Sequence, residues 1–404
     1  MVIMDILSAR LKKIQPSQTL VISAKARAMK SKGQDVISLS AGEPDFDTPI
    51  NIKNAGIAAI QSGQTKYTDV GGTPAVRQAV AQRLKADYNI DYQPEEIMVS
   101  SGGKQVIFNA MMASLNPGDE VIIPSPCWVS YPDIVTLAGG TPVIIPCKEE
   151  HAGFKLQPEQ LSAAITSKTK WLILNSPCNP TGAVYSKEEL QALCDVLMQY
   201  PNVWVLTDDI YSKLVYDGVV APTVVQVEPR LKERTITMNG VSKAYSMTGW
   251  RIGYAAAPVE FIKAMIKLQG QSTTNPCSIS QAATVEALTG SQDSVADMVA
   301  TYQKRRNLVL DNLNGAPGLS CLKPMGAFYL FVSMKNCLGK TTSKGTKINS
   351  DQDFVTALLE EEGVATVHGA AFMMAGYFRI SYATNTELLK EACLRIKHFC
   401  MNLS

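Results

Sequence analysis

Lys243 is the residue of this chain whose surroundings most favour covalent chemistry. It lies in TITMNGVSKAYSMTGWRIGY (235–254), just after an apolar run ends, among small and apolar residues. Desolvation lowers the pKa of a lysine, and a neutral amine can form a Schiff base with a carbonyl compound. In the same segment Arg251, flanked by Trp250 and Ile252, suits an anion. The alternative is an exposed loop lysine, so Lys243 needs support from other residues.

A glycine-rich turn is a second candidate, for anion binding. The apolar run EIMVSS (96–101) leads into Gly102, Gly103 and Lys104, and a helical pattern follows directly. A glycine turn at the start of a helix exposes free backbone N–H groups and the positive end of the helix dipole, which suits a phosphate. Because short glycine motifs often occur by chance, a simple tight turn is an equal alternative.

Two further apolar runs end in polar residues. Asp208 closes VWVLTD (203–208) and Tyr211 follows three residues later, while Asn179 lies in WLILNSPCNPTG (171–182). A buried carboxylate needs a cationic or hydrogen-bonding partner, because burial without one is costly. Taken singly, Asp208 is also explained as a helix N-cap and Asn179 as a turn residue.

One cofactor, pyridoxal 5′-phosphate, uses all of these groups together. Its aldehyde needs a lysine, its pyridinium nitrogen a carboxylate, its phenolate oxygen hydrogen-bond donors, and its phosphate cations and backbone N–H groups. Ligands of a doubly wound sheet gather at the carboxyl ends of the strands, which is where these residues are expected. The combination predicts a pyridoxal-phosphate site, although no single residue does.

The elements that must position these residues alternate between two patterns. Short apolar or β-branched runs predict strands, several of them buried on both faces. Helical patterns lie between many of these runs, for example at 104–115 and at 186–200, where Ser186 and Glu189 form a capping box. The alternation predicts an α/β fold with a mostly parallel sheet. The predicted strands are 96–101, 120–125, 142–146, 171–176, 203–208, 235–240 and 252–257.

Composition excludes several classes of protein. Of the 404 residues 46% are hydrophobic and 18% charged, and the net charge is +2, too small a field to hold a nucleic acid or an anionic membrane surface. No apolar run approaches the roughly 20 residues that span a bilayer. The nine cysteines show no C-x-x-C spacing and there are three histidines, so we expect no metal site. Reduced cysteines and an N-terminus without a secretory pattern favour the cytoplasm.

The two ends of the chain differ from its middle. Residues 1–47 lead into the turn-rich stretch SAGEPDFDTP, and the chain after about 311 predicts strands at 326–334 and 377–383 with helices beside them. The Lys/Ser/Thr-rich segment 339–350 is predicted to be an exposed loop. A chain of this length usually exceeds one core, so two domains are expected. Either the C-terminal part is a domain of its own, or both ends combine into one.

The order of the motifs resembles a known family, the class I pyridoxal-phosphate-dependent aminotransferases. Within the family the chain looks like the aspartate aminotransferase branch common in bacteria, some of whose members also use prephenate. The resemblance covers nearly the whole chain. It is carried by SAGEPDFDTP (40–49), KYTDVGGTPAVRQAV (66–80), SGGKQVIFNA (101–110), PCWVSYP (126–132), NSPCNPTGAVY (175–185), TDDIY (207–211), SKAYSMTGWRIGY (242–254), GAFY (326–329) and FRISYA (378–383).

The resemblance implies a fold, a domain division and a partner. The fold is pyridoxal-phosphate fold type I, with a mostly parallel seven-stranded sheet in a large domain over residues 48–310. A smaller α+β domain is built from residues 1–47 and 311–404. The active unit is a homodimer, in which Tyr67 reaches the phosphate in the other subunit.

The resemblance also implies what the cofactor-binding residues do. Lys243 forms the Schiff base and afterwards moves a proton as general base and acid. Asp208 pairs with the pyridinium nitrogen, Tyr211 and Asn179 bond the phenolate oxygen, and Trp128 stacks on the ring. The phosphate is held by Gly103, Lys104, Ser242, Arg251 and the partner's Tyr67.

Substrate binding follows from other motifs. By resemblance, Arg379 takes the α-carboxylate of the substrate as a bidentate pair, helped by Gly42, Asn179 and Trp128. The reaction implied is ping-pong transfer of the amino group from L-aspartate to 2-oxoglutarate, which gives oxaloacetate and L-glutamate. For the distal carboxylate we expect Lys104, with hydroxyl groups from Ser17 and Thr19. The alternative for Lys104 is a lysine that only caps the helix or faces solvent.

Other activities stay open. A prephenate or aromatic aminotransferase and a β-eliminating lyase use the same scaffold, and a non-catalytic regulator could keep the fold. Gln15 stands before Pro16 where prephenate-active members tend to have Lys, which weakens that alternative. Cys178 replaces an Asn and Asp209 a Glu of the usual motifs; neither is expected to touch the cofactor.

Overall fold

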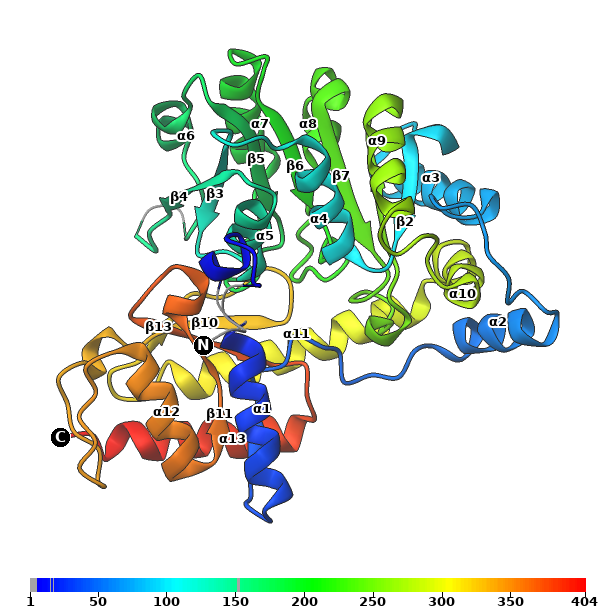
Figure 1. Ribbon diagram of the computed structural model, residues 1–404. Helices are drawn as coiled ribbons and strands as arrows, with labels where there is room; N and C mark the ends of the chain where they lie inside the picture. The colour runs from blue at the N-terminus through cyan, green and yellow to red at the C-terminus, as the bar shows by residue number, and fades with distance from the viewer. Residues whose placement is uncertain (1–5, 15, 17, 151–152) are drawn as a thin grey trace.

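A seven-stranded sheet forms the centre of the molecule (Figure 1). The computed structural model describes residues 6–14, 16, 18–150 and 153–404. The strand order is β2-β8-β7-β6-β5-β3-β4, and β8 is antiparallel to both of its neighbours while the other pairs are parallel. The strands are β2 (Ile97–Ser100), β3 (Glu120–Ser125), β4 (Thr141–Pro146), β5 (Thr169–Asn175), β6 (Trp204–Asp208), β7 (Thr235–Gly240) and β8 (Gly253–Ala256).

Both faces of this sheet are buried, which explains the continuously apolar runs of the sequence. Side chains alternate between the faces, so Met98 and Ile123 belong to one apolar cluster while Val99 and Ile122 belong to clusters on the opposite side. The first face packs on α4 (Gly103–Ser114), α5 (Ser130–Leu137) and α9 (Val259–Gly270). The second face packs on α6 (Pro158–Ala164), α7 (Lys187–Met198), α8 (Val224–Val227) and α3 (Pro74–Tyr88).

The predicted strands and helices of the middle region are confirmed, with bounds that differ by a few residues. The capping box of α7 is present: Ser186 Oγ accepts from the Glu189 N–H, and the Glu189 carboxylate accepts from the Ser186 N–H. The sheet is mostly parallel, as predicted. Strand β8 is the exception, since it runs antiparallel to both of its neighbours.

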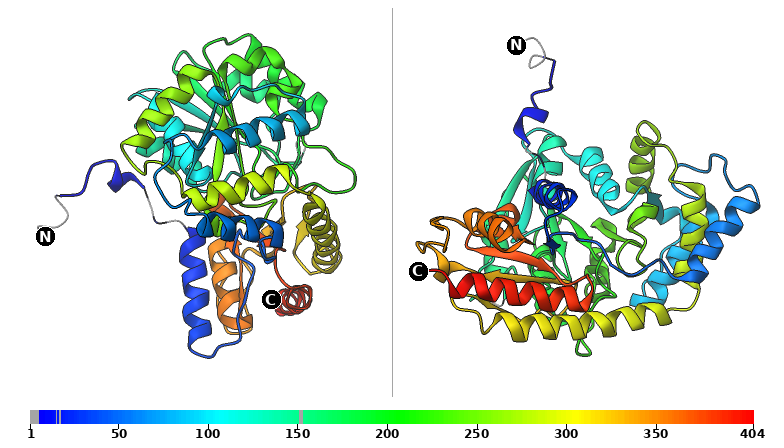
Figure 2. Two further views of the ribbon diagram at one scale, coloured as in Figure 1. Left: turned by 90° about the vertical axis from the view of Figure 1, so that its right-hand side faces the viewer. Right: turned by 90° about the horizontal axis from the view of Figure 1, so that it is seen from below.

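The segment that begins with helix α1 and the C-terminal part of the chain lie together below the large sheet (Figures 1 and 2). Strand β1 (Ile37–Ser38) pairs in parallel with β11 (Val364–Ala365), and α1 (Gln18–Ser31) packs near it. An antiparallel sheet has the order β12-β13-β10-β9. Its strands are β9 (Ser320–Cys321), β10 (Tyr329–Ser333), β12 (Val367–His368) and β13 (Tyr377–Ser381), and the helices beside it are α12 (Asp351–Glu362) and α13 (Thr386–Met401).

One long helix joins the two regions. Helix α11 (Asp293–Leu313) runs beneath the large sheet from α10 (Ser278–Thr289) towards α13 (Figure 1). It passes through position 310, where the sequence suggested a boundary, and the division at 47 and 310 stays a prediction. Helix α2 (Ile50–Gln61) packs on α10 at the far side. Short 3₁₀ helices lie at Leu11–Lys13, Pro94–Glu96, Pro229–Arg234, Thr248–Trp250, Lys335–Cys337 and Gly369–Phe372.

The segment 339–350 is exposed over much of its length but is not a free loop. Thr342 and Ile348 are buried, and the Thr342 hydroxyl donates to Glu361. These two side chains fix the segment against the C-terminal helices. No helix in the described part of the chain is long and apolar enough to cross a membrane.

Candidate active site

A cavity of about 440 Å³ lies at the carboxyl ends of β5, β6 and β7, between the large sheet and the region built from the chain ends. Strands place side chains of different chain segments at one edge, which is the position expected for a ligand of an α/β sheet. The cavity brings together most of the predicted site residues: Gly42, Gly103, Lys104, Trp128, Asn179, Asp208, Tyr211, Ser242, Lys243, Arg251 and Arg379.

Asp208 lies at the end of β6 with its carboxylate buried. Its Oδ2 accepts from the Tyr131 hydroxyl at 2.5 Å, and its Oδ1 accepts from the Ile210 N–H at 3.2 Å. Burial raises the pKa of Asp208 to about 6, against the opposing effect of these hydrogen bonds. No helix begins after Asp208, so the N-cap explanation is wrong. A buried carboxylate that is held only by donors suits a cationic ligand.

Lys243 projects into the same cavity from the segment after β7. Its Nζ donates to the Gly42 carbonyl oxygen at 2.6 Å. Burial lowers the pKa of Lys243 to about 8, and the positive charges of Arg379 and Arg251 add to this, although Glu43 opposes them. The surroundings of Lys243 therefore lower its pKa, which is the direction that the sequence argument predicts.

The glycine turn before α4 meets Arg251 at one end of the cavity. Gly102, with a φ of 99°, is the N-cap residue of α4. The first N–H groups of α4 have no partner within the helix. A Cβ at Gly102 would collide with the Arg251 guanidinium, and one at Gly253 would collide with the Gly103 backbone. The close approach that these glycines permit places a helix N-terminus beside a cation, which is an arrangement for a phosphate.

Arg379 in β13 is 3% exposed and approaches the cavity from the other side. Its Nη1 donates to Asn179 Oδ1 at 2.9 Å and its Nη2 donates to the Ser40 carbonyl oxygen at 2.6 Å. Its guanidinium lies 4.4 Å from the centre of the Tyr329 ring, and its Nε has no partner among the described residues. Because no carboxylate of the described residues forms an ion pair with Arg379, this buried cation suits the carboxylate of a ligand.

Lys104 and Trp128 line the wall between these two ends. Lys104 Nζ lies 4.9 Å from the centre of the Trp128 ring, and it has no hydrogen bond or ion pair with any residue that the structure describes. Burial lowers the pKa of Lys104, Arg251 lowers it further, and Asp133 opposes both. Trp128 in turn contacts Tyr131 edge to face at 5.3 Å. The Lys104 ammonium group therefore faces the cavity without a partner of its own.

Three predicted residues are not part of this cavity as described. Tyr67 is 92% exposed and lies in a separate surface hollow with Lys66 and Ser278. Ser17 lies outside the described residues, as does Gln15. Thr19 belongs to α1, but its side chain is not described. The roles predicted for these residues stay predictions.

Other cavity residues were not predicted from the sequence. Tyr131, the partner of Asp208, lies in the quoted motif PCWVSYP, and Tyr329, whose hydroxyl bonds that of Tyr211 at 2.8 Å, lies in GAFY. These motifs were the signal that could have identified both. Ser40, which opens the quoted motif SAGEPDFDTP, and Arg27 also line the cavity, and no motif of the sequence pointed to Arg27.

Cys178 and Asp209 lie outside the cavity lining, in line with the expectation that neither touches a cofactor. Cys178 Sγ contacts the Pro126 carbonyl oxygen at 3.7 Å. Asp209 accepts from the Thr207 hydroxyl at 2.6 Å, and burial raises its pKa to about 7. Both residues pack behind the wall of the cavity.

Comparison with known proteins agrees with this geometry. Residues 34–396 match the family model for aminotransferases of class I and II. An aspartate/prephenate aminotransferase of Cereibacter sphaeroides is 55% identical over 401 residues, which are 99% of this chain and 100% of that protein. The structure of an aspartate aminotransferase from Rhizobium meliloti has a TM-score of 0.96 at 51% identity and covers 98% of this chain and 99% of its own.

A more distant structure has the same fold. An aspartate aminotransferase from Thermus thermophilus, solved with maleate, has a TM-score of 0.90 at 41% identity, over 97% of this chain and 99% of its own. The central sheet, the placement of Lys243, Asp208 and Arg379 around one cavity, and the matching family model lead to one conclusion. The chain belongs to the class I and II aminotransferases.

Proposed function

We propose that this enzyme transfers the amino group of L-aspartate to 2-oxoglutarate through pyridoxal 5′-phosphate bound to Lys243. The observation that carries the proposal is the shared cavity of Lys243, Asp208 and Arg379, which supplies an amine, a carboxylate for a cationic ring and a cation for a carboxylate. The relatives described as aspartate aminotransferases support the choice of substrate.

The residues of the cavity fit this cofactor. Among the described residues, the buried Asp208 carboxylate has hydrogen-bond donors but no ion pair, and a pyridinium nitrogen would supply a cation. The N-terminus of α4 with Ser242 and Arg251 suits the phosphate, while Tyr211 and Asn179 suit the phenolate oxygen. When bound, the cofactor supplies an aldehyde that links to an amino group and a ring that withdraws electrons from the substrate Cα.

The protein performs the proton transfers and the orientation of the substrate. Above about pH 8 the Lys243 amine is mostly neutral, so it can take the proton from the substrate Cα and return it at the opposite end of the reacting system. Arg379 holds the α-carboxylate with its free N–H groups, and Asn179 fixes the guanidinium by accepting from Nη1. Ser40 fixes Nη2 in the same way. Holding the substrate in this orientation lowers the entropic part of the activation barrier.

Lys104 is proposed to select dicarboxylic substrates. Its unpartnered ammonium group lies on the cavity wall at Trp128, separate from Arg379, so one cation serves each carboxylate. The structure with maleate, a dicarboxylate, belongs to a relative 41% identical to this chain. Prephenate is a second candidate substrate, because the Cereibacter sphaeroides relative is described as an aspartate/prephenate aminotransferase. Gln15 before Pro16 weighs against it.

We also propose a cytoplasmic homodimer. Tyr67 is 92% exposed, and Ile50, Ile57 and Ile60 of α2 expose 67%, 50% and 55% of their surfaces nearby in the chain. A second copy would cover this apolar face and bring Tyr67 to the partner's phosphate site. Sedimentation of the wild-type enzyme should show a dimer, and Tyr67→Phe should weaken cofactor retention without altering assembly.

The visible absorption spectrum tests the central proposal. Protein prepared with pyridoxal phosphate should show a band that bleaches when L-aspartate is added and returns with 2-oxoglutarate. The Lys243→Ala variant is the control and should lack the lysine-linked band. A wild-type band that no amino acid changes would refute the proposed reaction. Steady-state rates with aspartate, prephenate, tyrosine and cystathionine then separate the alternatives.

A further inference from the structure

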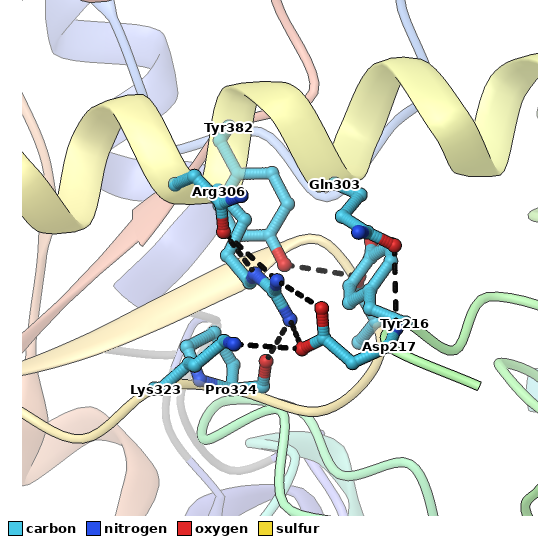
Figure 3. Close-up of polar contacts among 9 residues, drawn as sticks. Tyr216, Asp217, Gln303, Arg306, Lys323, Pro324 and Tyr382 are labelled. Atoms are coloured by element: carbon cyan, nitrogen blue, oxygen red, sulfur yellow. Dashed lines mark hydrogen bonds and ion pairs between the residues drawn. The ribbon is translucent and has the colours of Figure 1, made fainter. Parts of the chain in front are cut away.

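Arg306 lies in α11, outside the cavity, with a side chain that is 0% exposed. Figure 3 shows its guanidinium between Asp217, Pro324 and Lys323. Nη1 and Nη2 donate to the two carboxylate oxygens of Asp217 at 2.8 and 3.0 Å, and Nη1 also donates to the Pro324 carbonyl oxygen at 3.1 Å. Asn307 Oδ1 accepts from Nε and Nη2. Every N–H direction of the fork therefore has a partner.

The ion pair contributes to stability, because Arg306 and Lys323 lower the pKa of the Asp217 carboxyl to about 2. Arg306 is fully buried, whereas the Asp217 side chain is 28% exposed, so solvent screens part of this attraction. The bidentate geometry of the ion pair also fixes the relative position of whatever carries the two partners. What Arg306 does for the site therefore depends on the chain segments that it joins.

Arg306 joins two segments that run side by side towards the cavity. One is the 211–217 segment after β6, which contains Asp217; the other is the 323–329 segment before β10, which contains Pro324. Backbone hydrogen bonds tie the two together, from the Tyr216 N–H to the Met325 carbonyl at 3.0 Å and from the Ala327 N–H to the Leu214 carbonyl at 2.8 Å. Arg306 binds both segments at Asp217 and Pro324, which is the end opposite to Tyr211.

The opposite ends of the two segments carry residues of the site. Tyr211 begins the first and Tyr329 ends the second, and their hydroxyl groups are 2.8 Å apart. Tyr329 also stacks against the Arg379 guanidinium. Between the two ends, the Ala327 carbonyl accepts from the hydroxyls of Tyr216 and Tyr382, and Ala327 has a φ of 55°. An L-residue keeps that conformation only where its surroundings hold it.

We propose that Arg306 is a positioning residue of the aminotransferase reaction, which sets the place of Tyr211 and Tyr329 in the cavity by fixing the 211–217 and 323–329 segments together. It acts through Tyr211 and touches no substrate. The inference rests on the proposed function, because Tyr211 matters to the reaction as a donor to the cofactor's phenolate oxygen.

The test measures the pH midpoint of the visible absorption change of the holoenzyme. A hydrogen bond from Tyr211 to the phenolate oxygen stabilises the deprotonated chromophore, so weakening it should raise the midpoint. We expect Arg306→Met to raise it by about 0.5 to 1 pH unit, the size expected for one weakened hydrogen bond. If Arg306→Met does not yield soluble protein, Arg306→Lys keeps the cation, loses the fork and should give a shift in the same direction.

A matched control separates positioning from stability. Arg234 is a partly buried arginine directly before the start of β7, at the opposite sheet edge from the cavity, and it donates to the Leu197 and Tyr200 carbonyls. Arg234→Met should lower the melting temperature and leave the midpoint unchanged. In a Tyr211→Phe background, Arg306→Met should add less than about 0.2 unit, because coupled residues are not additive.

The outcomes distinguish the two proposals. A wild-type enzyme without a substrate-responsive band refutes the proposed function. A responsive wild type with the same midpoint in the Arg306 and Arg234 variants refutes the inference about Arg306 and leaves the function standing. A shift that persists in full in the Tyr211→Phe background also refutes it, because Arg306 would then act by another route.

Discussion

Replacing Lys104 with Met removes the ammonium group from the cavity and keeps an apolar stem against Trp128. In the structure Nζ lies 4.9 Å from the centre of the Trp128 ring and has no hydrogen bond or ion pair within the described residues, so the change strands no partner. A hydrogen bond between charged groups contributes about 1.5–3 kcal/mol. Because the Lys104 residue is exposed to solvent, we take the lower part, about 1.5–2 kcal/mol, which is about 10–30-fold in kcat/KM.

The assay compares two substrates in the same variant. Lys104→Met should lower kcat/KM for L-aspartate by about 10–30-fold and for L-alanine by less than about 3-fold, since alanine has no distal carboxylate to lose. Lys104→Arg should recover part of the loss. Lys263→Met, which removes an exposed lysine paired with Glu260 on α9, controls for a change in overall charge. Equal losses with both amino acids would show that Lys104 does not bind the distal carboxylate.

Three further predictions concern the groups that hold the cofactor and the α-carboxylate. Asp208→Asn should lower kcat by about 10²–10³-fold, as loss of one preorganised electrostatic group does. In the cofactor-free wild-type protein, burial raises the pKa of Asp208 to about 6, so the melting temperature should fall as the pH rises through that value. Asp208→Asn should abolish this fall. Arg379→Lys should cost about 10–150-fold in kcat/KM for aspartate and alanine alike, because both carry the α-carboxylate. In the cofactor-free protein, Lys243 should react with an aldehyde faster as the pH rises through about 8, measured by borohydride trapping; a rate that is flat across this range would contradict the lowered pKa.

The sequence was sufficient to predict the sheet and the residues at its strand ends. Each strand of the large sheet is a short apolar run, and a polar residue directly after such a run must lie at the edge where ligands gather. Asp208, Lys243 and the turn at Gly102 follow this rule. The family resemblance added Arg379 and the division of the chain, which the residues by themselves left open.

Contacts between distant segments could not be predicted from the spacing. The bond from Tyr131 to Asp208 joins residues 77 positions apart, and that from Arg379 to the Ser40 carbonyl joins residues 339 positions apart. Such pairs are set by how helices and sheets pack, not by local pattern. The same holds for Arg306, which appeared in the sequence as one of many charged residues in a helix.

The cationic groups of the cavity affect one another before any ligand binds. Burial lowers the pKa of Lys243 most, and the charges of Arg379 and Arg251 lower it further. A carboxylate bound to Arg379 and a phosphate beside Arg251 would neutralise these charges. The two anions would therefore raise the pKa of Lys243 again. The amine would then become more basic at the stage when it must take a proton from the substrate Cα. A net charge of +2 for the whole chain conceals this arrangement, because the charges that matter are concentrated in one cavity and are balanced elsewhere on the surface.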